Sequence, residues 1–323
     1  MRSWFVLLAF AFSSVAPLFA QENGGPAPVP ASTGVAPASV PDLRVVRDLP
    51  YVTGEAAHPT KHRLDLYLPV SVESGPAASG QGEAGTKPPL VMFVHGGAWQ
   101  MGDRRPYGTL GRAFAKRGIA CAAISYRLSP EVVHPAHVQD CASAFRWLVD
   151  HAAEYGYDRD LLFLCGHSAG AHLVALLATD PSYLQAHELA TKDVHGVMPI
   201  SGPFDVTAAV GVFTQPFGTD VEVRRDASPQ RHITKDAPPF LVLWADKDMA
   251  GLPLSGKMFA SALRRAEVAV ESAEITGRSH GSIIARVGSR DDRTTELVVD
   301  FVQRKSARPA AAVTAPSAGG TGR

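Results

Sequence analysis

The chain has 323 residues, a length that fits one or two domains of ordinary size. It carries 31 basic and 31 acidic residues, and this balance argues against a nucleic-acid-binding protein, which would need a basic excess. Hydrophobic residues make up 46% and charged residues 19%, as is typical of a globular protein. The three cysteines, Cys121, Cys141 and Cys165, form no Cys-x-x-Cys pair, so we expect free thiols and neither a disulfide framework nor a structural zinc site.

The N-terminal part of the chain has the features of a targeting segment followed by a linker. Arg2 precedes an apolar run over 4–12, and small residues then lead to Ala20. This order predicts a signal peptide over 1–20 that is cleaved near Ala20, and hence a periplasmic or secreted protein; a retained anchor is the alternative. Residues 21–41 are rich in Pro and Ala, which predicts a flexible linker. No later apolar run is long enough to cross a membrane.

The next segments alternate between short apolar runs and amphipathic ones. Residues 63–68 alternate with period two, which predicts a half-exposed antiparallel edge strand. The segment 71–86, rich in Gly and Ser, follows it and predicts a surface hairpin loop. Continuously apolar runs predict strands that are buried on both faces, at 90–94, 118–125, 161–165, 197–200 and 240–244.

Helical spacing of apolar residues recurs between these strands, at 138–152 and again at 297–302. Strands and helices in this order predict an α/β fold over 42–305, with a mostly parallel, doubly wound sheet and helices on both faces. Ligands of such sheets bind at the carboxyl ends of the strands. Residues 306–323 are expected to form a disordered tail.

A serine lies in the turn that follows the apolar run 161–165. The turn reads Gly166-His167-Ser168-Ala169-Gly170 and leads into a helix-like run. This is the G-x-S-x-G pattern between a strand and a helix, where small residues allow a sharp turn and the helix N-terminus stabilises negative charge. The context predicts a nucleophilic Ser168 rather than an ordinary strand–helix turn.

A second motif, His95-Gly96-Gly97-Ala98-Trp99, directly follows the apolar run 90–94. Two glycines at the end of a central strand leave backbone N–H groups open, as an oxyanion hole requires. The expected donors are the N–H groups of Gly97, Ala98 and Ala169. His95 and Gly96 are expected to support the loop, with His95 forming structural hydrogen bonds rather than acting as a base.

Two aspartates, Asp246 and Asp248, follow the apolar run 240–244. Asp248 is favoured as the acid that orients a histidine, and Asp246 is the alternative, with a turn-forming role otherwise. His280 follows a strand expected at 269–275, where one ring nitrogen could reach Ser168 and the other Asp248. The chain has 12 histidines but no His-Glu-x-x-His motif and no paired His/Asp cluster at metal spacing, so no metal site is expected.

These motifs together resemble α/β-hydrolases of the carboxylesterase and hormone-sensitive-lipase type, and most closely the group with feruloyl-type esterases and kynurenine formamidases. Further matching segments lie at 125–128, 201–205, 227–229 and 237–241, so the resemblance spans nearly all of 62–285. The chain departs from the family at Trp244-Ala245, where His-Gly is usual, and at an extra residue in 249–253. Both departures leave the choice between Asp248 and Asp246 open. The resemblance implies an α/β-hydrolase fold, esterase activity and a Ser-His-Asp triad.

The sequence therefore predicts a serine hydrolase that cleaves carboxylic esters through an acyl-enzyme and needs no cofactor. Its expected substrate is a small-molecule or acylated-glycan ester with a short acyl group. The reason is a short cap-like insertion at 203–238 that carries many charges, because a charged cap is costly to bury in lipid. The alternative is that these charges form only a solvated face and say nothing about the pocket. The alternatives are an arylformamidase or amidase, which an export signal does not suit, and a non-catalytic binding protein, which typically lacks a triad residue.

Overall fold

The computed structural model describes residues 43–70, 87–207 and 211–307. The predicted signal peptide over 1–20, the linker over 21–41 and the loop over 71–86 lie outside these ranges. So does the predicted tail apart from its first two residues, and Ser306 still belongs to the last helix. No helix in the described ranges is long and apolar enough to cross a membrane.

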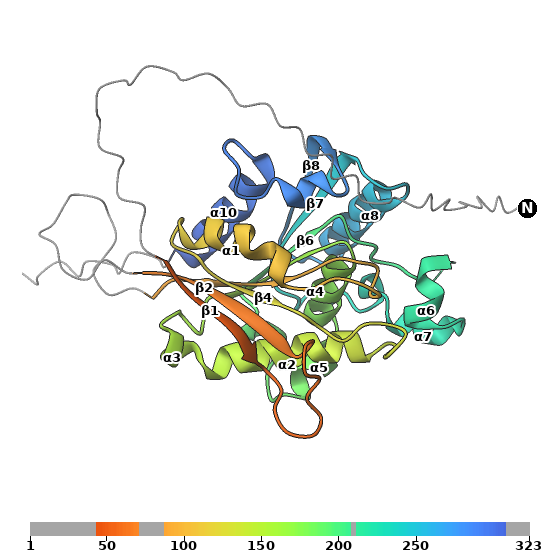
Figure 1. The fold of residues 1–323 in the computed structure, drawn as a ribbon. Helices are drawn as coiled ribbons and strands as arrows, with labels where there is room; N and C mark the ends of the chain where they lie inside the picture. The colour runs from red at the N-terminus through yellow and green to blue at the C-terminus, as the bar shows by residue number, and fades with distance from the viewer. Residues whose placement is uncertain (1–42, 71–86, 208–210, 308–323) are drawn as a thin grey trace, which may run out of the picture.

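One sheet forms the centre of the described chain, with the strand order β1-β2-β4-β3-β5-β6-β7-β8 (Figure 1). From β4 to β8 neighbouring strands are parallel, whereas β2 is antiparallel to both β1 and β4. The mostly parallel sheet is therefore confirmed. The strands span Leu43–Pro50 (β1), Arg63–Pro69 (β2), Leu90–Val94 (β3), Ala120–Ile124 (β4), Leu162–His167 (β5), Gly196–Ile200 (β6), Phe240–Lys247 (β7) and Val270–Ser279 (β8).

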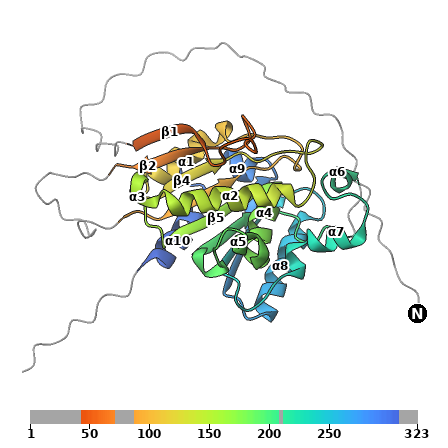
Figure 2. The same ribbon diagram turned by 90° about the horizontal axis from the view of Figure 1, so that it is seen from below.

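Helices cover both faces of the sheet, as predicted (Figures 1 and 2). The α-helices span Gly108–Ala115 (α1), Ala136–Asp150 (α2), Ala152–Tyr155 (α3), Ala169–Thr179 (α4), Pro181–Gln185 (α5), Thr214–Phe217 (α6), Val221–Asp226 (α7), Leu252–Arg265 (α8), Ser282–Ala285 (α9) and Arg293–Ser306 (α10). Short 3₁₀ helices span Arg105–Tyr107 (η1), Thr191–Asp193 (η2), Gly211–Phe213 (η3) and Pro229–Arg231 (η4). The predicted helices at 138–152 and 297–302 correspond to α2 and α10.

The core consists of two clusters of buried side chains, one on each face of the sheet. Helices α2, α4 and α8 pack against one face, and α1 and α10 pack against the other. Every residue of β3, β4, β5 and β6 is buried. This double burial explains why the sequences of these strands are almost continuously apolar.

Strand β2 differs from the predicted edge strand, because β1 pairs with its outer side and five consecutive residues of β2 are buried. Its alternating pattern does not mark a solvent-exposed face. Asp65 is buried, and Nε of Arg104 donates a hydrogen bond to its Oδ1 at 2.9 Å, so the charge is paired inside the protein. The prediction of a hairpin at 71–86 is also wrong, because β4 lies between β2 and β3 in the sheet.

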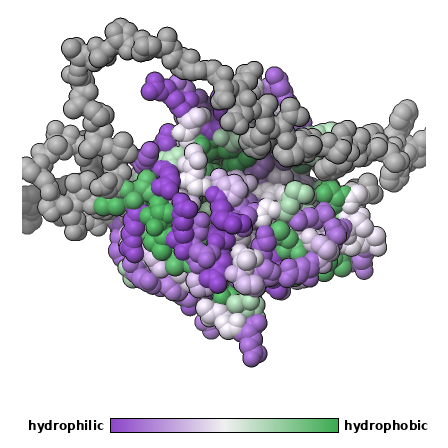
Figure 3. Space-filling view, viewed as in Figure 1, coloured by the Kyte–Doolittle hydropathy of each residue, from purple (hydrophilic) through white to green (hydrophobic). Residues whose placement is uncertain are grey.

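The described part of the cap-like segment 203–238 contains η3, α6, α7 and η4, and α6 and α7 project at one side of the molecule (Figure 2). Cys121, Cys141 and Cys165 are buried free thiols, as predicted. On the face drawn in Figure 3, hydrophobic residues of the described surface lie in several separate patches among hydrophilic ones.

Candidate active site

The segments that carry the candidate residues converge at one edge of the sheet. Ser168 follows β5, Asp248 follows β7 and His280 follows β8, while the loop that begins at His95 follows β3. These four strands are parallel, so their carboxyl ends lie at the same edge. The topology therefore brings together residues that are far apart in the sequence.

The turn at Ser168 has a backbone conformation that L-amino acids rarely adopt, with φ 56° and ψ −118°. Its neighbours leave no room for side chains. A Cβ at Gly166 would lie 2.3 Å from the carbonyl oxygen of Gly170, and a Cβ at Gly170 would lie 2.1 Å from that of Val94. The two glycines are thus required by close backbone approach, and the turn presents Ser168 at the N-terminus of α4.

Ser168, His280 and Asp248 form a continuous hydrogen-bonded chain. The hydroxyl of Ser168 donates to Nε2 of His280 at 2.9 Å, and Nδ1–H of His280 donates to Oδ1 of Asp248 at 2.6 Å. The Asp248 side chain is fully buried and that of His280 is 20% exposed. Asp246, the alternative acid, lies in β7, and its Oδ1 accepts the backbone N–H of Arg278 at 3.0 Å. Of the two carboxylates, the structure places Asp248 against the histidine.

Asp248 is held by a second side chain that the sequence analysis did not assign. The hydroxyl of Ser201 donates to Oδ2 of Asp248 at 2.5 Å, and the backbone N–H of Ala245 donates to the same oxygen at 3.2 Å. Burial opposes ionisation of Asp248, but hydrogen bonds from His280 and Ser201 outweigh it, so the pKa of this carboxyl lies below its ordinary value. Ser201 directly follows β6, which lies between β5 and β7. The sequence signal that could have identified Ser201 is its position directly after the apolar run 197–200.

The loop after β3 lies directly beside the serine. A Cβ at Gly96 would be 3.0 Å from Cβ of Ser168. Gly97 and Ala98 both have positive φ values, of 118° and 53°. Within the described ranges, the backbone N–H groups of Gly97, Ala98 and Ala169 donate to no other group. These are the three donors predicted for an oxyanion hole, and they are open to a ligand.

His95 is fully buried behind this loop. Its Nδ1–H donates to the carbonyl oxygen of Gly96 at 2.7 Å, and its ring stacks on Tyr126 with the centroids 4.5 Å apart. Burial lowers the pKa of His95 to about 4, so the ring is neutral at pH 7. These contacts agree with the loop-supporting role that the sequence suggests.

A cavity of about 590 Å³ opens over Ser168 and His280. Aromatic and aliphatic side chains dominate its lining, which includes Trp99, Met101, Tyr107, Pro203, Val212, Phe213, Met249, Leu252 and Ile284. No Asp, Glu, Lys or Arg of the described residues lines it.

The charges of the cap-like segment do not face this cavity, and of the described residues in 203–238 only Pro203, Val212 and Phe213 line it. Arg231 instead pairs with Asp205 at 2.8 Å on the outside of the segment. These charges therefore give no information about the acyl group that the cavity accepts, as the alternative of a solvated outer face implies.

The family model BD-FAE matches residues 80–263, more than half of the chain. The chain belongs to the BD-FAE family. This agrees with the resemblance seen in the sequence motifs.

Curated relatives of this BD-FAE protein include two kinds of hydrolase. Esterase LipQ from Mycobacterium tuberculosis is 34% identical over 237 residues, which are 68% of this chain and 56% of LipQ. Kynurenine formamidase from Danio rerio is 27% identical over 266 residues, which are 80% of this chain and 82% of that protein. The chain spans about half the length of LipQ and of two further curated relatives from Mycobacterium tuberculosis, LipM and LipC.

Solved structures similar to this BD-FAE chain include esterases. A truncated carbohydrate esterase from gut microbiota has a TM-score of 0.68 at 20% identity, covering 84% of this chain and 99% of that one. Esterase B from Lactobacillus rhamnosis has a TM-score of 0.67 at 20% identity, covering 82% of this chain and 87% of that one. These similarities show the α/β-hydrolase fold.

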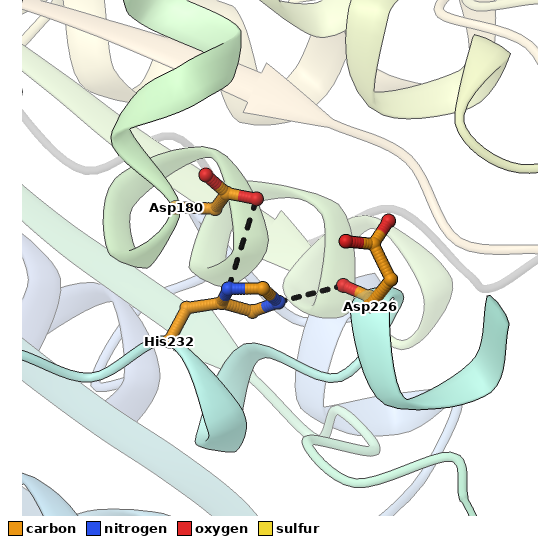
Figure 4. A group of neighbouring side chains, drawn as sticks. All are labelled: Asp180, Asp226 and His232. Carbon is orange, nitrogen blue, oxygen red and sulfur yellow. Dashed lines mark hydrogen bonds and ion pairs between the residues drawn. The ribbon is translucent and has the colours of Figure 1, made fainter. Parts of the chain in front are cut away.

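Among the described residues, one group of His and Asp side chains that could hold a metal ion lies outside the active site (Figure 4). Asp180, Asp226 and His232 each bring a possible ligand atom within 4.8 Å of the others, a grouping that sequence spacing did not predict because the residues come from separate segments. Nε2–H of His232 donates to the backbone oxygen of Asp226 at 2.7 Å, and Nδ1 lies 3.7 Å from Oδ2 of Asp180. His134 adds a 2.9 Å contact to Oδ2 of Asp226. These contacts link the cap-like segment of this BD-FAE protein to its core.

Proposed function

We propose that this protein hydrolyses carboxylic esters, with Ser168 as nucleophile, His280 as general base and acid, and Asp248 as the residue that orients His280. The observation that carries the proposal is the hydrogen-bonded chain from Ser168 through His280 to Asp248, with distances of 2.9 and 2.6 Å. Ser168 and His280 of this chain line a cavity beside three open backbone N–H groups. The esterase names of several relatives support the same reaction class.

The first half of the reaction acylates Ser168. His280 Nε2 takes the proton of the hydroxyl as Oγ attacks the carbonyl carbon, and the N–H groups of Gly97, Ala98 and Ala169 stabilise the oxyanion. The N-terminus of α4 adds positive potential at the same point. His280 then gives its proton to the leaving alcohol oxygen, and the acyl-enzyme forms.

The second half repeats these steps with water. Nε2 of His280 takes a proton from water, the resulting hydroxide attacks the acyl carbon, and the proton passes to Oγ of Ser168. Asp248 keeps the proton of neutral His280 on Nδ1 and stabilises the imidazolium that forms in each half. The low pKa of its carboxyl keeps Asp248 ionised for this role. Every step uses groups of the chain, the ester and water, so the scheme needs no cofactor.

The preferred substrate in this proposal is a small neutral ester, or an acylated glycan, with a short acyl group. A single cavity of about 590 Å³ has to accommodate both sides of the scissile bond, which favours short groups. Its uncharged and largely apolar lining favours a neutral substrate, because a buried unpaired charge is costly.

Formamide hydrolysis is the second candidate, since the kynurenine formamidase relative covers 80% of this chain. The same nucleophile and oxyanion donors could act on a formyl group. Kynurenine is an α-amino acid, however, and its ammonium and carboxylate groups would find no charged partner in the described cavity lining. This observation favours the ester. A comparison of kcat/KM for p-nitrophenyl acetate and N-formylkynurenine distinguishes the two.

The central test is Ser168→Ala, with Ser143→Ala on the exposed side of α2 as a control. We expect Ser168→Ala to lose at least about a thousandfold in kcat on p-nitrophenyl acetate without loss of thermal stability. The control should keep wild-type activity. Substantial turnover by Ser168→Ala would rule out the proposed nucleophile and would revive a binding function for the cavity.

The proposal also includes export, which rests on the signal-like sequence over 1–20. Intact-mass analysis of protein from the native cell envelope or culture medium should find a chain that begins near Gln21. A mass that includes residues 1–20 would contradict cleavage.

A further inference from the structure

His167 connects the turn of the nucleophile to the loop of the base. Its Nε2–H donates to the backbone carbonyl oxygen of His280 at 2.9 Å. The two imidazole rings also pack together, with their centroids 4.6 Å apart and a 40° angle between their planes. The reaction scheme for Ser168 assigns no task to His167, although this side chain also lines the cavity.

The environment of His167 fixes its protonation state. The residue is only 6% exposed, and burial together with the neighbouring His280 lowers the pKa of His167 to about 3. The ring is therefore neutral at pH 7. Because a carbonyl oxygen only accepts, the single ring proton lies on Nε2. The hydrogen bond thus adds no positive charge beside His280, which itself becomes a cation during the reaction.

The loop that carries His280 needs a hydrogen bond to the rest of the protein, such as the one from His167, to hold its position. Gly277 and Gly281 flank this part of the chain, and both are exposed. The N–H of Arg278 is tied to Asp246, and that of Ser279 to Ser282 within the loop. Within the described ranges, His167 is the one side chain that hydrogen-bonds the backbone of His280.

The contacts of His167 form a closed path of covalent and hydrogen bonds through His167, Ser168 and His280. His167 and Ser168 are adjacent in the chain, Ser168 Oγ contacts Nε2 of His280, and the carbonyl of His280 returns to Nε2 of His167. We propose that His167 is a positioning residue that fixes the distance between Oγ of Ser168 and Nε2 of His280. This inference rests on the proposed serine hydrolase function. In this view, two hydrogen bonds position His280 relative to Ser168. His167 binds the backbone of His280, and Asp248 binds its imidazole ring.

Three substitutions test the role of the hydrogen bond separately from that of the ring. His167→Phe keeps an aromatic ring and removes the donor. His167→Gln places an amide N–H where Nε2 lies, whereas the shorter His167→Asn cannot reach it. On p-nitrophenyl acetate we expect kcat to fall about tenfold to a hundredfold in the Phe and Asn variants, with KM within about twofold of wild type. The Gln variant should recover most of the lost kcat.

A second readout is the rate at which a fluorophosphonate inactivates Ser168, which reports nucleophile activation without a leaving alcohol. It should fall in the Phe and Asn variants in parallel with kcat. Circular dichroism and Tm identify any variant that does not fold, and if Phe fails this check the Gln and Asn pair decides.

The proposal is overturned if a folded Phe or Asn variant keeps kcat within about twofold of wild type, or if Gln is as impaired as Asn. Ser168→Ala, measured on the same substrate, distinguishes a failure of the proposed function from a failure of the positioning role of His167. If Ser168→Ala stays active, the proposed function fails and the positioning role falls with it. If Ser168→Ala is inactive while His167→Phe keeps wild-type kcat, only the positioning role is wrong.

Discussion

Ser201 donates a 2.5 Å hydrogen bond from the end of β6 to Oδ2 of Asp248 at the end of β7. The other oxygen of Asp248 accepts Nδ1–H of His280, so the two carboxylate oxygens have separate partners. Ser201 has a φ of 54°, a conformation rarely adopted by residues other than glycine. The chain is therefore held in an uncommon backbone conformation at the point where the hydroxyl meets Asp248.

We predict that Ser201→Ala lowers kcat about tenfold, because one oxygen of a buried carboxylate loses its hydroxyl donor. The lost hydrogen bond also raises the pKa of Asp248 toward its ordinary value, because that bond is among the causes of its low pKa. The measurement is kcat on p-nitrophenyl acetate for a variant whose Tm shows that it is folded; a kcat within about twofold of wild type would show that Ser201 does not support Asp248.

The two aspartates should respond differently to the same change. Asp248→Asn should lower kcat by about 10⁴-fold, because an amide favours the wrong tautomer of His280. Asp246→Asn should have a much smaller effect, since its amide oxygen can still accept the N–H of Arg278. Steady-state kinetics of both variants decides the ranking. The reverse order would assign the acid role to Asp246.

Gly170→Ala should destabilise the protein by about 1–3 kcal/mol or more, because the new Cβ would lie 2.1 Å from the carbonyl oxygen of Val94. Gly281→Ala is the matched control for stability, since a Cβ there meets no atom within 4 Å. Urea unfolding curves give both free energies of unfolding. Equal stabilities for the two variants would contradict the close approach of α4 to β3.

Asp140 is a buried carboxylate that links distant segments, and Asp140→Asn should cost about 3 kcal/mol of stability at pH 7. Arg127 contacts Oδ1 at 2.6 Å and His62 contacts it at 3.1 Å. Burial opposes ionisation of Asp140, but its contact with His62 and its hydrogen bonds from Arg127 outweigh burial and hold its pKa below the ordinary value.

The pH dependence of this stabilisation follows from that direction. A depressed folded-state pKa gives stability that is complete above the unfolded pKa of about 4 and is lost as the pH falls through the folded value. The difference in free energy of unfolding between the wild type and Asp140→Asn should therefore shrink below about pH 4. Free energies of unfolding between pH 2.5 and 7 provide the check. A constant difference across this range would contradict the role of the ionised carboxylate.

Local patterns predicted most of the fold and the main site segments. The apolar runs mark the buried strands, and the glycine-containing turns at Ser168 and after β3 are local motifs with a defined geometry. What the sequence did not reveal depends on pairing between distant segments. The edge position of β1, the burial of Asp65 beside Arg104 and the contact of Ser201 with Asp248 exist only after the sheet has formed. The choice of Asp248 over Asp246 likewise required the position of His280.

The reacting residues and some of the residues that shape the cavity come from different segments of the chain, and this affects how the substrate preference can change. The reacting groups lie at strand ends of the central sheet, whereas Val212 and Phe213 reach the cavity from a separate segment that projects from it. Substitutions at these two positions can reshape the cavity without altering the hydrogen bonds of Ser168 or His280. Directed evolution for new substrates would therefore best begin at Val212 and Phe213, because neither side chain takes part in the hydrogen bonds of Ser168 or His280.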